Sequence, residues 1–178
     1  MNINDIKTIA VIGAGDMGHG IAEVALIAGY KVFLRDINRE VVDRGVGRIN
    51  ASLEKLVSKG KVPAHHFEKI KTELMVPCTD LAEAVKEADL VIEAIPEIMD
   101  LKKETFKAMD AAAPAHTIFA SNTSTMRITE IASVTRRPEK VIGLHYFNPA
   151  VLMKLVEVIK GDQTTPEAFQ FGYDFVVK

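Results

Sequence analysis

The chain has 178 residues, of which 48% are hydrophobic and 26% charged, and its formal net charge is -2. This length suits one domain with a substantial core, and the balanced charge argues against nucleic acid or an anionic membrane surface as a partner. The sequence has no apolar run long enough to span a membrane and no signal-peptide pattern at its start, and its single cysteine, Cys78, favours a cytoplasmic location.

The first predicted elements form a nucleotide-binding unit. Residues 7–12 (KTIAVI) are typical of a buried parallel strand, and a helical pattern runs from 17 to 28. Between them lies the run Gly13-Ala14-Gly15-Asp16-Met17-Gly18, and a second strand over 31–34 leads to Asp36, 18 residues after Gly18. This order of strand, glycine turn, helix and acid-terminated strand is the dinucleotide-binding fingerprint.

The residues of the fingerprint have separate physical roles. Gly13 permits the tight turn, Gly15 lets a pyrophosphate approach the backbone, and Gly18 packs the helix against the strand. The N–H groups at the start of the helix are expected to bind the phosphates. Asp36 would accept hydrogen bonds from ribose hydroxyls and repel a 2′-phosphate, so the predicted cofactor is NAD rather than NADP, although Arg35 could offset part of that repulsion.

Strand and helix patterns alternate through the rest of the chain. Helices are predicted over 38–59, 63–73, 80–86, 101–112 and near 129–133, and strands over 74–76, 90–94 and 117–120. The predicted fold class is α/β: a Rossmann-type doubly wound, mostly parallel sheet with a helical insertion after the second strand, forming an NAD-binding domain over 1–178. Ligands of such sheets bind beyond the carboxyl ends of the strands, where polar residues gather at 93–97, 121–125, 145 and 148.

Two polar side chains interrupt the last two predicted strands. One strand ends at His145, and the other carries Glu157 at its centre, where a carboxylate is expected to be buried and to need a partner. Asn148-Pro149 indicates a turn, and a reversal near Val151 places Glu157 opposite His145. A buried pair of this kind fixes the imidazole tautomer and raises its basicity, as in a general base. The same pair could also be purely structural.

These residues together resemble the L-3-hydroxyacyl-CoA dehydrogenase family. The sequence is similar to its N-terminal, NAD-binding domain in the blocks VIGAGDMGHGIA, ADLVIEAIPE, FASNTST and GLHYFNPAVLMKLVEVI. The resemblance implies NAD-dependent oxidation of a 3-hydroxyacyl-CoA to the 3-ketoacyl-CoA. It implies that His145 is the catalytic acid/base and that Glu157 orients it, while Ser124 and Asn148 lie in the same site near substrate and cofactor.

The resemblance assigns further residues to the two ligands. Glu97 and Lys102 would lie along the cofactor, together with residues 13–18, and Ser52 and Lys59 would contact coenzyme A. Ser52, Lys55 and Lys59 share one helix face by their spacing. That spacing alone suits either phosphate binding or an ordinary solvated face.

The family also has a helical domain after the one resembled here, which implies a homodimer formed through that domain. Thr165-Pro166 is expected to begin a helix, the start of the domain that would be cut off after about 165. We expect the apolar residues Phe171, Phe175 and Val176 of this helix to be unburied.

Two other functions stay open at this point. A non-catalytic module that senses NAD(H) would need residues 13–18 and Asp36 but has no use for a His145–Glu157 pair. A dehydrogenase of free 3-hydroxy acids would not need Ser52 and Lys59. We expect no metal site, because the five histidines show no spacing of metal ligands.

Overall fold

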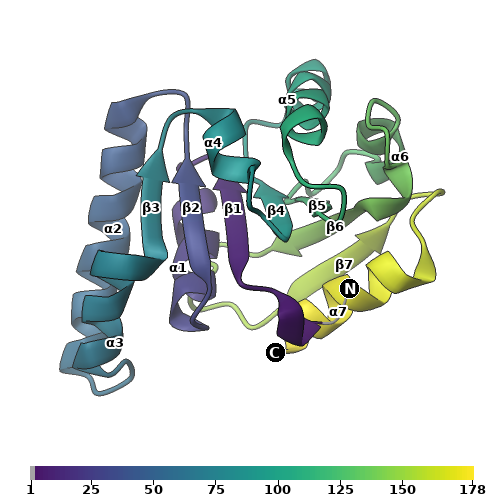
Figure 1. Ribbon diagram of the computed structural model, residues 1–178. Coiled ribbons are helices and arrows are strands. Elements are labelled where there is room, and N and C mark those ends of the chain that lie inside the picture. The colour runs from purple at the N-terminus through teal and green to yellow at the C-terminus, as the bar shows by residue number, and fades with distance from the viewer. Residues whose placement is uncertain (1–2) are drawn as a thin grey trace.

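The computed structural model describes residues 3–178 and contains one sheet with helices on both faces (Figure 1). The strands are β1 (Thr8–Ile12), β2 (Lys31–Arg35), β3 (Met75–Cys78), β4 (Leu90–Glu93), β5 (Ile118–Ser121), β6 (Val141–Tyr146) and β7 (Val156–Lys160). Their order in the sheet is β3-β2-β1-β4-β5-β6-β7, and all pairs are parallel except β6 with β7. The predicted Rossmann-type fold is confirmed.

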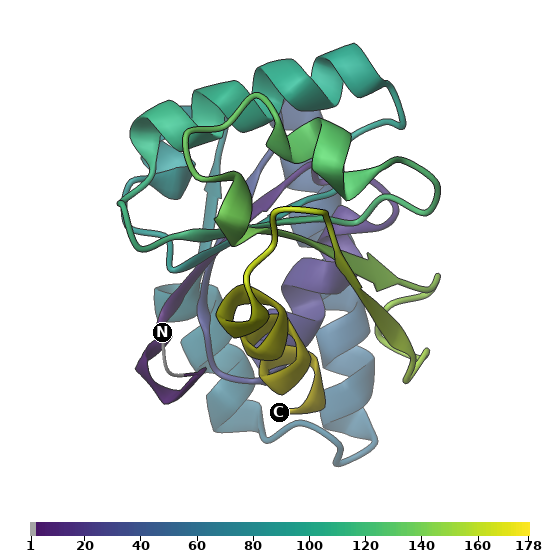
Figure 2. The ribbon, with the colours of Figure 1, turned by 90° about the vertical axis from the view of Figure 1, so that its right-hand side faces the viewer.

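The helices divide between the two faces of the sheet. They are α1 (Gly18–Ile27), α2 (Arg39–Ser58), α3 (Ala64–Lys69), α4 (Leu81–Val85), α5 (Met99–Ala112), α6 (Ile128–Ala132) and α7 (Pro166–Val177), with short turns η1 (Ile3–Asp5), η2 (Ile70–Leu74) and η3 (Pro138–Lys140). Figure 2 shows α5 and α6 on one side of the sheet and α1 and α7 on the other. Each face has its own apolar core, and successive residues of β1 alternate between them: Ile9 and Val11 point to one core and Ala10 and Ile12 to the other.

The predicted helical insertion after β2 consists of α2, α3 and the π-helical turn η2. The strand predicted over 74–76 begins one residue later and runs to Cys78, because Leu74 still belongs to η2. This strand contains Pro77, which cannot donate a backbone hydrogen bond. Its position at the edge of the sheet, beside β2 alone, explains why the proline is tolerated there.

The last helix, α7, packs against the sheet. Thr165 accepts a hydrogen bond from the N–H of Ala168 at 3.2 Å, so the predicted start of this helix is correct. The expectation of an unburied apolar face is wrong: Phe171 and Phe175 are 3% and 9% exposed, and Val176 packs against the same core. The face is buried because α7 folds back onto β6 and β7, where the ring of Phe175 meets that of Tyr30 at 5.8 Å between centroids.

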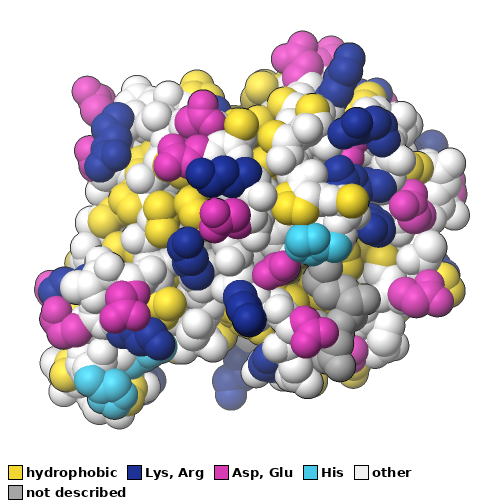
Figure 3. Space-filling model, in the orientation of Figure 1, with side chains coloured by type: hydrophobic (Ala, Val, Ile, Leu, Met, Phe, Trp, Pro, Cys, Tyr) yellow, Lys and Arg dark blue, Asp and Glu magenta, His cyan; other side chains and the backbone are white. Residues whose placement is uncertain are grey.

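The surface carries both signs of charge. Figure 3 shows acidic and basic side chains interspersed over one face of the molecule. Among residues 3–178, none of the helices has the length and apolar composition needed to cross a membrane.

Candidate active site and cofactor cavity

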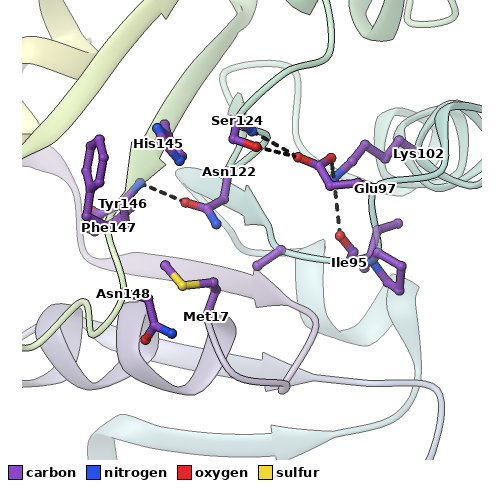
Figure 4. A pocket seen from close by; sticks show the side chains of 12 residues that line it. Met17, Ile95, Glu97, Lys102, Asn122, Ser124, His145, Tyr146, Phe147 and Asn148 are labelled. Atoms are coloured by element: carbon purple, nitrogen blue, oxygen red, sulfur yellow. Dashed lines mark hydrogen bonds and ion pairs between the residues drawn. The ribbon is translucent and has the colours of Figure 1, made fainter.

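Two adjoining cavities lie beyond the carboxyl ends of the parallel strands. The glycine-turn cavity, about 520 Å³, is lined by Gly13, Gly15, Asp16, Asp36, Ile37 and Leu101 among others. The His145 cavity, about 450 Å³, is lined by Glu97, Lys102, Asn122, Ser124, His145 and Asn148 among others (Figure 4). Met17 and residues 94–96 line both. The two cavities therefore form a continuous site for an extended ligand.

The glycines of the turn are required for different reasons. Gly13 has a φ of +106°, and a Cβ atom there would lie 2.5 Å from the carbonyl oxygen of Ala94. A Cβ atom on Gly18 would lie 1.7 Å from the oxygen of Gly13, so α1 can approach the turn only with glycine at this position. A Cβ atom on Gly15 would meet no atom of the described residues within 4 Å. The protein's own packing therefore requires Gly13 and Gly18, whereas Gly15 leaves room for a ligand, as the fingerprint predicts.

Asp36 closes the glycine-turn cavity at the end of β2. Its carboxylate accepts the N–H of Ala14 at 2.9 Å and the N–H of Ile37 at 2.8 Å. Ile37 is 81% exposed, and Leu101, which lines the same cavity, is 38% exposed. A carboxylate beside exposed apolar side chains suits a ribose that carries a flat apolar base, so the residues present fit the adenosine part of a dinucleotide.

His145 and Glu157 form the predicted pair across the β6–β7 ladder. They are direct partners in the antiparallel register, and His145 Nδ1 lies 2.8 Å from Glu157 Oε2. The hydrogen bond to the carboxylate makes Nδ1 the donor, so the lone pair of the neutral ring lies on Nε2. The expectation that Glu157 is buried is wrong, because its side chain is 53% exposed, against 17% for His145. The reason is that β7 is an edge strand whose side chains are all partly or fully exposed.

A buried ion pair supports the wall of the His145 cavity. Lys102 and Glu93 are 1% and 0% exposed, and Lys102 Nζ lies 2.6 Å from Glu93 Oε1. The same ammonium group lies 3.3 Å from Glu97 Oε2 and donates to the carbonyl of Ile95 at 3.2 Å. The three N–H donors of the Lys102 ammonium group are therefore all engaged by protein atoms. Lys102 lines the predicted site and holds Glu97 and Ile95 in position there.

Glu97 links this ion pair to the loop after β5. Its Oε1 accepts the hydroxyl of Thr123 at 2.8 Å and the N–H of Ser124 at 2.9 Å. Burial by itself raises the pKa of Glu97, but hydrogen bonds from Ser124, Thr123 and Lys102 and the charge of Lys102 together lower it below its ordinary value. Glu97 is therefore a fixed negative charge that holds Ser124 at the cavity.

Asn122 is a site residue for which no role was predicted. It follows β5, lines the His145 cavity, and accepts the N–H of Tyr146 at 2.8 Å through Oδ1 (Figure 4). The signal was present, because Asn122 belongs to the polar run 121–125, but the contact to β6 joins residues 24 positions apart. Asn148 also lines this cavity, as predicted, from the loop after β6.

The predicted coenzyme A residues lie outside both cavities. Ser52 is half-buried in α2 and directs its hydroxyl to the carboxyl group of Glu23 on α1, whereas Lys55 and Lys59 are exposed. None of the three lines either cavity. Among residues 3–178, no group of three or more His, Cys, Asp or Glu side chains could hold a metal ion.

A Rossmann fold with a glycine turn, a ribose-binding acid and a histidine–carboxylate pair defines a dinucleotide-dependent oxidoreductase domain. Residues 8–178 match the family described as "3-hydroxyacyl-CoA dehydrogenase, NAD binding domain". The chain therefore belongs to this family, and NAD is its cofactor.

Similar proteins from three bacteria agree with this assignment. A 3-hydroxybutyryl-CoA dehydrogenase of Clostridioides difficile is 44% identical over 168 residues, which cover 93% of this chain and 58% of that protein. A 3-hydroxyadipyl-CoA dehydrogenase of Escherichia coli is 45% identical over 170 residues, which cover 96% of this chain and 35% of that protein. The crystal structure of (S)-3-hydroxybutyryl-CoA dehydrogenase from Ralstonia eutropha is similar with a TM-score of 0.92 and 35% identity, over 97% of this chain and 60% of that one.

Proposed function

We propose that this chain is the NAD-binding part of an enzyme that oxidises L-3-hydroxyacyl-CoA to 3-ketoacyl-CoA. The observation that carries the proposal is the His145–Glu157 pair, because its 2.8 Å hydrogen bond orients a proton acceptor at the cavity that adjoins the glycine turn. The chain spans 35% to 60% of the length of the similar dehydrogenases, so the activity is proposed for the protein in which this part occurs.

The residues of the His145 cavity perform the proton transfer in this proposal. Nε2 of His145 takes the proton of the 3-hydroxyl group, and Glu157, hydrogen-bonded to Nδ1, stabilises the imidazolium that forms. In the reverse direction the imidazolium returns that proton to the 3-keto oxygen. NAD, when bound at the glycine turn, would supply the redox chemistry as the acceptor of the hydride from C3.

Other predicted residues hold the two ligands. Ser124 and Asn148, which line the same cavity, position the substrate oxygen and the reacting end of the cofactor. Ser52, which is half-buried on α2, and Lys59, which is exposed, contact coenzyme A. Because Ser52 directs its hydroxyl to Glu23, it presents its oxygen as an acceptor, and the positive charge is supplied by Lys59.

The test uses a fusion of residues 1–178 to the remaining part of the Clostridioides difficile relative, with NADH formation from L-3-hydroxybutyryl-CoA as the signal. His145→Gln should lower turnover on the order of 10²–10⁴-fold, and Glu157→Gln should lower it less. The double variant should resemble His145→Gln alone, because both residues act in one proton transfer.

The matched control is His116→Gln. His116 also pairs with a carboxylate, that of Asp89 at 3.0 Å, but it does not line the His145 cavity. Turnover in this variant should be unchanged, and NAD binding in every variant shows that the fusion is folded. Near-normal turnover of His145→Gln would return the pair to a structural role.

Two alternatives make different predictions in the same assay. An NAD(H)-sensing module would bind NAD but form no NADH with any 3-hydroxyacyl substrate. A dehydrogenase of free 3-hydroxy acids would oxidise 3-hydroxybutyrate at least as fast as its CoA ester. Lys59→Met would not change the ratio of these two rates.

The resemblance also supports an assembly and a location. In this proposal the NAD-binding domain covers residues 1–178, a helical domain that starts after about 165 makes a homodimer, and the protein works in the cytoplasm. The burial of α7 supports assigning this helix to the NAD-binding domain and not to the helical domain, because Phe171 and Phe175 belong to the Rossmann core. Light scattering on residues 1–178 and on the fusion tests the assembly, and a dimer of the short chain would place the contact within it.

A further inference from the structure

The glycine turn carries a negative side chain where a pyrophosphate has to bind. Asp16 lies between Gly15 and Met17, lines the glycine-turn cavity, and has a side chain that is 81% exposed. The N–H groups at the start of α1 favour an anion here, but a free carboxylate competes for them and repels a ligand of the same sign. The fingerprint leaves this position open, so the charge of Asp16 is a property of this chain.

One arginine from a distant part of the chain neutralises that charge. Arg48, on α2, places Nη1 2.6 Å from Asp16 Oδ1. The hydrogen bond and the positive charge of Arg48 lower the pKa of Asp16, with a smaller contribution from His19, so the carboxyl group is ionised and paired. The pair is open to solvent, since the Arg48 side chain is 52% exposed.

The approach of α2 to the turn has its own structural basis. Gly45 lies one helical turn before Arg48, and a Cβ atom on Gly45 would lie 3.0 Å from the carbonyl oxygen of Ala14 and 3.2 Å from its Cβ. Glycine at this position lets α2 pass directly over the glycine turn. Because residues three apart share a helix face, the close approach at Gly45 brings Arg48 to Asp16.

We infer that Arg48 is a positioning residue of the cofactor site, which pairs with Asp16 and so lets the glycine turn accept the pyrophosphate of a dinucleotide. The guanidinium removes the repulsion between Asp16 and the phosphates and draws the carboxylate away from the free N–H groups of α1. The inference concerns cofactor binding alone, so it does not depend on the proposed hydroxyacyl-CoA reaction.

The test measures the dissociation constants of NAD, ADP and adenosine by calorimetry at low ionic strength with residues 1–178. Arg48→Met should weaken NAD and ADP about threefold to tenfold and leave adenosine unchanged, because adenosine has no phosphate. Asp16→Asn should bind NAD at least as tightly as the unmodified chain. In the double variant Arg48→Met, Asp16→Asn, the affinity should return to within about twofold of the unmodified chain.

Lys55→Met is the matched control, because it removes a positive charge from the same face of α2. Lys55 lies two turns beyond Arg48 and does not line the glycine-turn cavity. NAD affinity should stay within about twofold in this variant. Equal loss of affinity on Arg48→Met with and without Asp16→Asn would overturn the inference, since Arg48 would then bind phosphate directly. Unchanged affinity in Arg48→Met would overturn it as well, whereas a chain that binds neither NAD nor ADP would contradict the cofactor site itself.

Discussion

Single side chains decide which ligand the site accepts, and Asp36 is the clearest case. Its carboxylate lies at the end of β2, where it holds the N–H groups of Ala14 and Ile37. A 2′-phosphate placed beside it would be repelled, so NAD should bind at least about tenfold more tightly than NADP, or about 1.4 kcal/mol. Titration with both cofactors measures the difference, and Asp36→Ala should narrow it. Equal affinities in the unmodified chain would contradict the role of Asp36.

Glu23 is a buried carboxyl group that the proposed reaction does not use. Its side chain lies on α1 with 1% exposure, and Oε1 has no hydrogen-bond partner among the described residues. Burial raises the pKa of Glu23, and the hydrogen bond from Ser52 only partly opposes this. The folded state therefore holds the proton of Glu23 more strongly than the unfolded state does.

The sign of the stability effect follows from this difference. Below the unfolded pKa of about 4.3 the group is protonated in both states and makes no pH-dependent contribution to stability. As the pH rises through the raised folded pKa, the folded state loses stability. Glu23→Gln should therefore increase the free energy of unfolding at pH 7 by about 1 kcal/mol, and the gain should vanish near pH 4. Urea unfolding at both pH values measures this, and equal stabilities at pH 7 would contradict it.

At the scale of elements, α7 is part of the Rossmann core. Phe175 is 9% exposed, packs against Tyr30, and lies in the same core as residues of β6. Phe175→Ala should lower the free energy of unfolding by about 3 kcal/mol, because truncating a buried phenylalanine leaves a cavity. Tyr173→Ala is the control, since Tyr173 on the same helix is 52% exposed and should change stability by less than about 1 kcal/mol. Similar small losses in both variants would show that α7 is only loosely attached.

The elements themselves were largely predictable from the sequence. The order of strands and helices followed from buried apolar runs and glycine boundaries, and the β6–β7 register followed from the position of the turn at Asn148-Pro149. The burial of Phe171 and the exposure of Glu157 were not predictable in this way. Both depend on where α7 and β7 lie in the finished sheet, and a local pattern carries no information about that.

At the scale of the whole molecule, the site contains residues from nearly the entire chain, brought together beyond the carboxyl ends of the parallel strands. The glycine turn and Asp36 come from the first 36 residues, and His145 and Glu157 come from the last 34. Motifs identified these residues because each motif is local. The Arg48–Asp16 pair joins positions 32 residues apart, and the contact of Asn122 with Tyr146 joins the loop after β5 to β6, so neither followed from spacing in the sequence.

The antiparallel pairing of β6 with β7 makes the His145–Glu157 contact an all-or-none feature. Side chains alternate along a strand, so a shift of β7 by one residue would carry Glu157 to the opposite face of the sheet and put a valine, Val156 or Val158, beside the imidazole. A shift by two residues would restore the face but bring Leu155 or Ile159 opposite His145. The backbone hydrogen bonds between β6 and β7 therefore fix the His145–Glu157 contact, because every other register of the two strands removes it.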